Sequence, residues 1–128
     1  MKFRTLVAVP FVALSLVGCG SGGSGSGSGG TTPANATVIT AIEGIAWDAK
    51  TYTATPVNGK ITLALRNNSS LPHNLHLLNA ENVDQGVALD VKGRNDVHTL
   101  DYSLPAGVYK VICTIAGHGN MKATLTIT

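Results

Sequence analysis

Three residues with metal-binding side chains lie close together near the carboxyl end of the chain. Cys113, His118 and Met121 all fall within residues 111–121, which read VICTIAGHGNM. They offer a thiolate, an imidazole and a thioether, a mixture of soft and nitrogen donors that suits an ion cycling between Cu(I) and Cu(II). The spacing therefore predicts that one loop supplies three ligands to a single copper ion.

A fourth ligand has to come from another part of the chain. A copper site of the electron-transfer type uses two His, one Cys and a weak axial Met. His73 is the best candidate for the second His, because it follows the turn-like run NNSS at residues 67–70 and begins an expected strand. Such a site has no open coordination position, so its chemistry is to gain and lose one electron.

Each of these residues also has an ordinary structural explanation. A lone Cys is most simply a buried small hydrophobic residue, but two His and a Met nearby favour a ligand role for Cys113. His76 lies three positions after His73, so we expect it on the opposite, solvent-facing side of the strand. His98 is likewise expected at the surface.

The elements that must position these ligands have the patterns of β-strands. Short stretches of β-branched and alternating apolar residues are separated by Gly, Pro, Asn and Ser, which is typical of a β-sandwich. Trp47 and Tyr109 are expected to be core or half-buried aromatic residues. The expected strands are residues 36–41, 51–55, 60–67, 73–78, 97–100, 108–114 and 122–128.

Residues 79–96 are the exception to the strand pattern. Val83, Val87 and Val91 recur every four positions, which allows a short helix, although Gly86 weakens it. We therefore expect an excursion from the all-β fold here, as a loop or a short helix.

The first residues have the features of an export signal. Lys2 and Arg4 precede an apolar stretch over residues 6–17, which is shorter than the about 20 residues that span a bilayer. The stretch ends in LVGC, which resembles the lipobox of bacterial lipoproteins. That resemblance implies removal of residues 1–18 and lipidation of Cys19. The alternative is an ordinary signal peptide that happens to contain a Cys.

A flexible tether and one folded domain follow the signal. Residues 19–33 comprise Cys19 and a Gly/Ser-rich linker that has nothing to bury. Residues 34–128 form the single domain, with a modest core. The predicted organisation is a domain held near a bacterial membrane by a lipid anchor, on the periplasmic or cell-surface side.

The charge balance excludes several classes of partner. The chain has nine Lys and Arg and seven Asp and Glu. Because Lys2 and Arg4 belong to the signal, the mature chain is formally neutral. The sequence has no basic face or run of like charges of the kind that binds nucleic acid. Because the mature chain is neutral, attachment to a membrane must come from the lipid rather than from charge. We expect a monomer.

The ligand-bearing segments resemble those of the cupredoxins, the azurin and plastocyanin family. CTIAGHGNMKATLTIT, residues 113–128, is similar to the azurin-type ligand loop and last strand. LPHN, residues 71–74, is similar to the segment carrying the first His ligand in plastocyanin. LPAGVY, residues 104–109, matches the family pattern ahead of the Cys strand. The resemblance covers nearly all of residues 36–128 and implies a Greek-key β-sandwich.

The resemblance also implies that each domain binds one copper ion through a defined set of ligands. His73, Cys113 and His118 bind copper in a plane, Met121 sits axially, and Asn74 ties the two ligand segments together by hydrogen bonds. The His-to-Met interval is two residues here, against three in typical azurins and four in plastocyanins. Amicyanin-like loops still place their Met at the copper, so a shorter loop can do the same with Met121. The short interval leaves the distance between Met121 and the copper open.

A docking surface follows from the same resemblance. Electrons enter and leave through His118, whose ring in such folds lies near the surface. An uncharged, partly apolar patch around it suits brief contact with redox proteins through a small interface, although loop-end packing is the alternative explanation. We name this the docking patch; it comprises Leu71, Pro72, Ala116, Gly119 and Asn120.

These observations predict a membrane-tethered one-electron carrier rather than an enzyme. Copper nitrite reductases and multicopper oxidases need further His clusters, and beyond the two predicted ligands only His76 and His98 remain. A dinuclear copper centre needs a second Cys in the domain. The alternative is a periplasmic copper-binding or delivery protein without an electron-transfer role, which would favour an exposed site with several Met.

Overall fold

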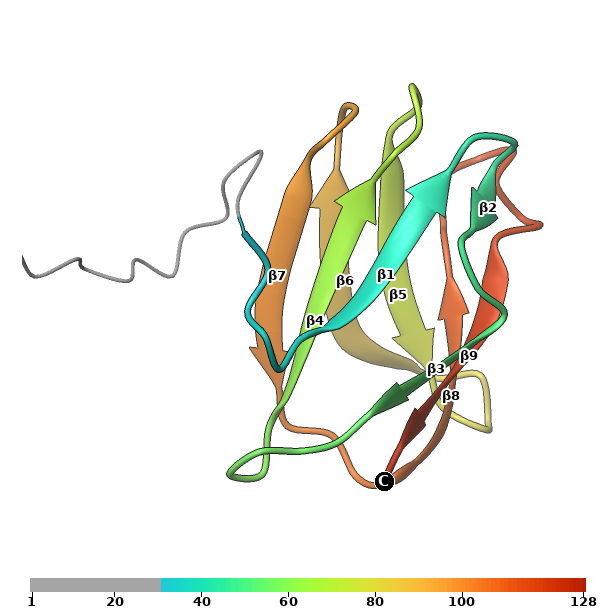
Figure 1. The fold of residues 1–128 in the computed structure, drawn as a ribbon. Helices are drawn as coiled ribbons and strands as arrows, with labels where there is room; N and C mark the ends of the chain where they lie inside the picture. The colour runs from blue at the N-terminus through green and yellow to red at the C-terminus, as the bar shows by residue number, and fades with distance from the viewer. Residues whose placement is uncertain (1–30) are drawn as a thin grey trace, which may run out of the picture.

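Two β-sheets pack face to face in the computed structural model, which describes residues 31–128 (Figure 1). One sheet has four strands in the order β2-β1-β4-β7, and the other has five in the order β3-β9-β8-β5-β6. The strands are β1 (Thr37–Ile42), β2 (Ala46–Trp47), β3 (Thr51–Ala54), β4 (Ile61–Asn67), β5 (His73–Leu78), β6 (Asp84–Val91), β7 (Val97–Tyr102), β8 (Gly107–Ile112) and β9 (Lys122–Ile127).

The predictions for the N-terminal residues cannot be compared with the structure. The signal peptide over residues 1–18, the lipidation site Cys19 and the Gly/Ser run over residues 20–30 lie outside the described residues. Within residues 31–128, no helix has the length and apolar character needed to cross a membrane.

The strand connections give a Greek-key β-sandwich, as predicted. Both sheets mix the two pairing directions: β1 runs parallel to β4 and β3 runs parallel to β9, whereas the remaining neighbours are antiparallel. The chain passes from one sheet to the other after β2, β3, β4, β6 and β7. These crossings bring segments that are distant in sequence to the same end of the sandwich.

Alternating side chains build the core between the sheets. Along β5 and β9 every second residue is buried, because successive side chains of a strand point to opposite faces. Leu63, Leu75 and Leu125 are fully buried, and Trp47 and Tyr109 are almost so. Both aromatic residues are therefore core residues, as expected.

The structure corrects the prediction for residues 79–96. They contain strand β6 rather than a loop or short helix. Val87 and Val91 are buried on its inner side, and a spacing of four fits two periods of a strand as well as one turn of a helix. Gly86 has a φ of +74° where the β5–β6 register shifts, so this Gly allows a bulge in the strand.

A corner before β8 fixes the start of the strand that leads to Cys113. The hydroxyl of Tyr109 donates a hydrogen bond of 2.7 Å to the carbonyl of Pro105, as in the tyrosine corners of other sandwiches. Gly107 between them has a φ of +153°, which favours glycine. The LPAGVY sequence thus sets where β8 begins.

Candidate metal centre

Three of the four predicted ligands extend the buried rows of strands, and the fourth, His118, lies in the loop between β8 and β9. His73 is the first residue of β5, Cys113 directly follows β8, and Met121 directly precedes β9. Each lies two positions from a buried residue of its own strand, so strand alternation turns each side chain toward the interior. The β4–β5 and β8–β9 connections meet at the upper end of the sandwich (Figure 1).

Three donor atoms of this cluster lie within reach of one metal ion. One ligand atom each from His73, Cys113 and His118 lies within 4.8 Å of the other two. Cys113 Sγ is 3.6 Å from His118 Nδ1, and the two imidazole centroids are 4.9 Å apart. Ligands bound to one ion at about 2.0–2.3 Å are separated by about 3–4.5 Å, so small side-chain adjustments suffice.

Two consecutive turns shape the loop between Cys113 and Met121. The His118 amide donates to the carbonyl of Ile115 over 3.0 Å. Gly117, third in that turn, has a φ of +85°, which a type II turn requires at this position. The Met121 amide then donates to the carbonyl of His118 over 2.9 Å.

The second turn explains how a short interval still delivers the Met. His118 and Met121 are the first and last residues of one hydrogen-bonded turn, so no further residue is needed to reverse the chain between them. Met121 is only 1% exposed. The thioether therefore lies inside the sandwich, at the same end as the three other donors.

Two buried polar residues that the sequence analysis missed hold His73. Ser69 Oγ lies 2.7 Å from His73 Nε2. The Asn67 side chain accepts hydrogen bonds from the Ser69 amide and hydroxyl and donates one of 2.8 Å to the carbonyl of Leu71. Asn67 and Ser69 are at most 1% exposed. The NNSS run was interpreted only as a turn, because hydroxyl and amide residues are common in turns whether or not they touch a ligand.

The hydrogen bond to Nε2 leaves the other imidazole nitrogen available. Within residues 31–128, His73 Nδ1 is buried and has no hydrogen-bond partner, an arrangement that costs free energy unless something occupies it. Burial, then the neighbouring His118, lowers the pKa of His73. A neutral imidazole with one free nitrogen is the form that binds a metal.

Asn74 links the two ligand-bearing segments. The side-chain nitrogen of Asn74 donates a hydrogen bond to Thr114 Oγ1 over 2.8 Å, and the side-chain oxygen of Asn74 accepts one from the Thr114 backbone amide over 2.7 Å. Thr114 directly follows Cys113. This reciprocal pair fixes the residue after the thiol against the residue after His73.

Replacing Ser69 by Ala should lower copper affinity by about 10- to 100-fold, the usual effect of losing the group that orients a ligating His. Isothermal titration against a competing chelator measures the change. Ser69→Thr should restore most of the affinity, because it keeps a hydroxyl. Ser70→Ala is the matched control, because Ser70 is exposed and only its backbone amide makes a hydrogen bond, to Glu43. Equal affinities of the two Ala variants would mean that packing alone orients His73.

The two imidazoles differ in their access to solvent. His73 is 1% exposed and His118 is 7% exposed. All five residues of the docking patch are exposed, and they belong to the two loops that carry these His. His76 faces outward, and its Nδ1 pairs with Asp84 over 2.9 Å, so it takes no part in the cluster.

The donor set identifies the metal that fits. A thiolate, two imidazoles and a thioether are soft and nitrogen ligands, and two His with one Cys and an axial Met are characteristic of mononuclear copper in electron transfer. His73 Nδ1, which has no hydrogen-bond partner among residues 31–128, is a second indication that these residues are arranged for a metal. When bound, copper supplies one-electron redox chemistry.

Comparison with known proteins gives structural neighbours only. No protein-family model matches the chain, and no curated protein matches it. Auracyanin A, a "blue" copper protein from the green thermophilic photosynthetic bacterium Chloroflexus aurantiacus, is 21% identical over 73% of this chain and 98% of its own, with a TM-score of 0.61.

Two further solved structures have the same architecture. Amicyanin from Paracoccus versutus is 19% identical over 84% of this chain and 94% of its own, with a TM-score of 0.58. The azurin Az-iso2 from the obligate methylotroph Methylomonas sp. strain J is 13% identical over 75% of this chain and 99% of its own, with a TM-score of 0.59. This chain therefore has the cupredoxin fold, and His73, Cys113, His118 and Met121 at one end of it fit one copper ion.

Proposed function

We propose that this protein is a one-electron carrier that uses a mononuclear copper site. The observation that carries the proposal is the buried cluster of His73, Cys113 and His118, whose donor atoms lie within 4.8 Å of one another. Protein donors surround the metal position, and Met121 is buried beside them. A site closed in this way favours electron exchange over substrate binding.

The route for electrons follows from exposure. His118 is the ligand imidazole with more exposed surface, and the exposed, uncharged residues of the docking patch belong to the two loops that adjoin the ligand His. A redox partner that covers this patch comes close to a copper ligand through a small, short-lived interface. Asn74 and Ser69 hold the remaining ligand segments still during the exchange.

Adding Cu(II) to the protein should produce an intense visible absorption that disappears in Cys113→Ser. The colour comes from the copper–thiolate bond, and an alcohol at that position cannot replace it. The absorption spectrum, read with the copper content, makes the measurement. Cys19→Ser is the matched control, because it removes the other Cys of the chain and should leave the colour unchanged. A wild-type protein that folds but stays colourless would contradict the proposal.

Copper delivery is the alternative function, and the site geometry weighs against it. A donor of copper must release its ion, whereas His73, Cys113 and Met121 are nearly inaccessible to a receiving protein. Repeated reduction and reoxidation separates the two roles. A carrier retains its copper in both states, and a delivery protein loses Cu(I) to a mild chelator.

We also propose that a lipid on Cys19 tethers the carrier to a bacterial membrane from the outside. The LVGC sequence and the Gly/Ser-rich linker support this placement. In a bacterial host, Cys19→Ser should move the protein from the membrane fraction to a soluble exported fraction. Mass spectrometry of the N-terminal peptide checks the acyl groups directly. A wild-type protein in the soluble fraction, without acyl groups, would refute the tether.

A further inference from the structure

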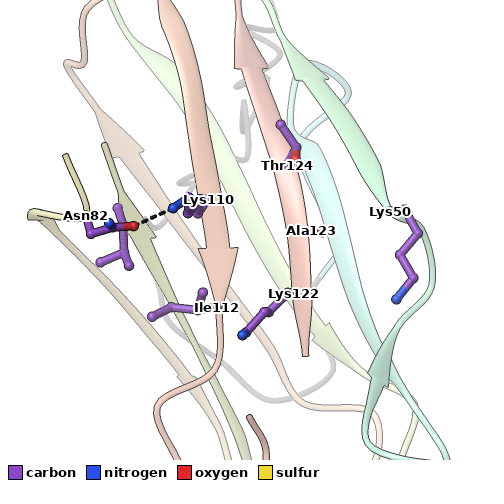
Figure 2. A pocket seen from close by; sticks show the side chains of 8 residues that line it. Lys50, Asn82, Lys110, Ile112, Lys122, Ala123 and Thr124 are labelled. Carbon is purple, nitrogen blue, oxygen red and sulfur yellow. Dashed lines mark hydrogen bonds between the residues drawn. The ribbon is translucent and has the colours of Figure 1, made fainter. Parts of the chain in front are cut away.

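Three Lys line a groove on the outer face of the five-stranded sheet (Figure 2). Lys110 lies on β8, Lys122 begins β9, and Lys50 directly precedes β3. The groove encloses about 520 Å³, and Leu78 and Ile112 contribute apolar surface to it. We call this feature the lysine groove.

Strand register brings these positive charges together. Lys110 pairs with Thr124, and Ile112 pairs with Lys122. Lys110 and Lys122 are therefore diagonal neighbours on one face of an antiparallel pair, about 7–8 Å apart at the backbone. The Thr124 amide donates to the carbonyl of Lys50 over 2.9 Å, which fixes the third Lys beside the same strand.

No carboxylate in the described part of the chain forms an ion pair with the three Lys of the lysine groove. Within residues 31–128 the ion pairs are His76–Asp84 and Arg94–Glu43. Lys110 Nζ instead donates to the neutral side chain of Asn82, the contact drawn in Figure 2. Three of the seven Lys and Arg outside the signal thus gather in one place, in a mature chain that is formally neutral. Like charges held together repel one another, so the arrangement favours an anionic occupant.

The surroundings indicate the kind of anion. A polybasic membrane contact uses four to eight basic residues on a surface that meets a flat bilayer, whereas this feature is a hollow with three. A small-anion site needs converging donors, but Leu78 and Ile112 add apolar surface to the same groove as the three Lys. Apolar surface beside polar and charged side chains is compatible with a protein–protein interface, which combines an apolar core with a polar rim.

We propose that the lysine groove docks the acidic face of a redox partner protein. Ile112 directly precedes Cys113, and Lys122 directly follows Met121, so a partner seated there contacts both segments that lead into the metal centre. The charges steer the approach of the partner. The inference rests on the proposed electron-carrier function only for the identity of the partner as a redox protein.

A titration that needs no copper tests the docking site. Polyglutamate peptide, followed by amide NMR shifts of the whole protein, should perturb Lys110, Ile112 and Lys122 in a saturable manner. The triple variant Lys50→Gln/Lys110→Gln/Lys122→Gln should bind the peptide about fivefold more weakly or worse. The matched control is Lys60→Gln/Arg66→Gln/Lys92→Gln, which removes the same charge elsewhere and should keep binding. Equal weakening in both variants, or binding to phosphatidylglycerol vesicles without binding to the peptide, would overturn the proposal.

Electron transfer gives a second, independent measurement. Oxidation of the Cu(I) protein by ferricyanide, a trianion, should slow on the order of tenfold in the groove variant at low ionic strength. The difference should shrink as salt is added. The control variant should change less, and equal rates in both variants would count against the groove. Failure of the proposed copper function appears separately, as a missing visible absorption, because peptide binding does not depend on the metal.

Discussion

Loading one copper ion should raise the free energy of unfolding by about 4 kcal/mol when the free ion is at 1,000 times its Kd. The ion binds a folded site, and the unfolded chain does not bring His73 close to the loop that carries Cys113, His118 and Met121. The ion also occupies His73 Nδ1, which is buried without a hydrogen-bond partner within the described residues. Because about 1 kcal/mol moves the Tm of a domain this size by about 4–8 °C, the Tm should rise on the order of 20 °C.

Calorimetry of the copper-free and Cu(I)-loaded protein under anaerobic conditions measures this effect. Cys113→Ser supplies the control, because it removes the thiolate and should keep only a small part of the stabilisation. Ser69→Ala should fall between the two, since His73 loses the hydrogen bond that orients it. A Tm that does not move on loading would mean that the copper binds outside this cluster.

Shortening Leu75 to Ala should lower the free energy of unfolding by about 2–5 kcal/mol. Leu75 is fully buried and lies two residues after His73 on the inner side of β5. Removing its side chain loses transfer free energy and leaves a cavity that rigid neighbours on both sheets fill only in part. The loss is comparable with the expected gain from copper, so copper loading should offset much of it.

Urea denaturation followed by the fluorescence of Trp47, the only Trp, measures the change. Leu100→Ala is the control, because Leu100 is 42% exposed and surface substitutions usually stay within about 0.5 kcal/mol. Similar losses of unfolding free energy in the two variants would show that Leu75 contributes no more to the core than an exposed Leu. Added copper should restore part of the lost stability without altering the absorption spectrum, since the ligands are unchanged.

The sequence predicted most of the fold because its strands have clear boundaries. β5 follows NNSS, β8 follows a Pro-Ala-Gly turn, and the expected strands agree with the observed ones to within one or two residues. β2 was not predicted, because a strand of two residues is too short to show an alternating pattern of apolar and polar side chains. β6 was missed because valines four apart fit both a helix and a strand. Its antiparallel pairing with the preceding strand β5 decides in favour of the strand.

The candidate site was only partly predictable. Cys113, His118 and Met121 are close in sequence, and their side-chain chemistry is distinctive, so the loop could be found. The part played by Ser69 depends on the hydroxyl meeting His73 Nε2 across a buried turn, which sequence spacing does not encode. The lysine groove was also missed, because Lys50 and Lys110 become neighbours of Lys122 only through the pairing of three strands.

The position of β9 in the chain sets the order in which the metal centre is assembled. β9 closes the five-stranded sheet by pairing with β8 on one side and with β3, about 70 residues earlier, on the other. Such non-local pairing is slow and comes late in folding. A chain that is still bound to the ribosome or passing through an export channel therefore contains Cys113 and His118 before β9 has paired. The loop that holds the two ligands is not yet fixed at that stage. We therefore expect copper insertion to follow synthesis and, if the chain is exported, to follow export.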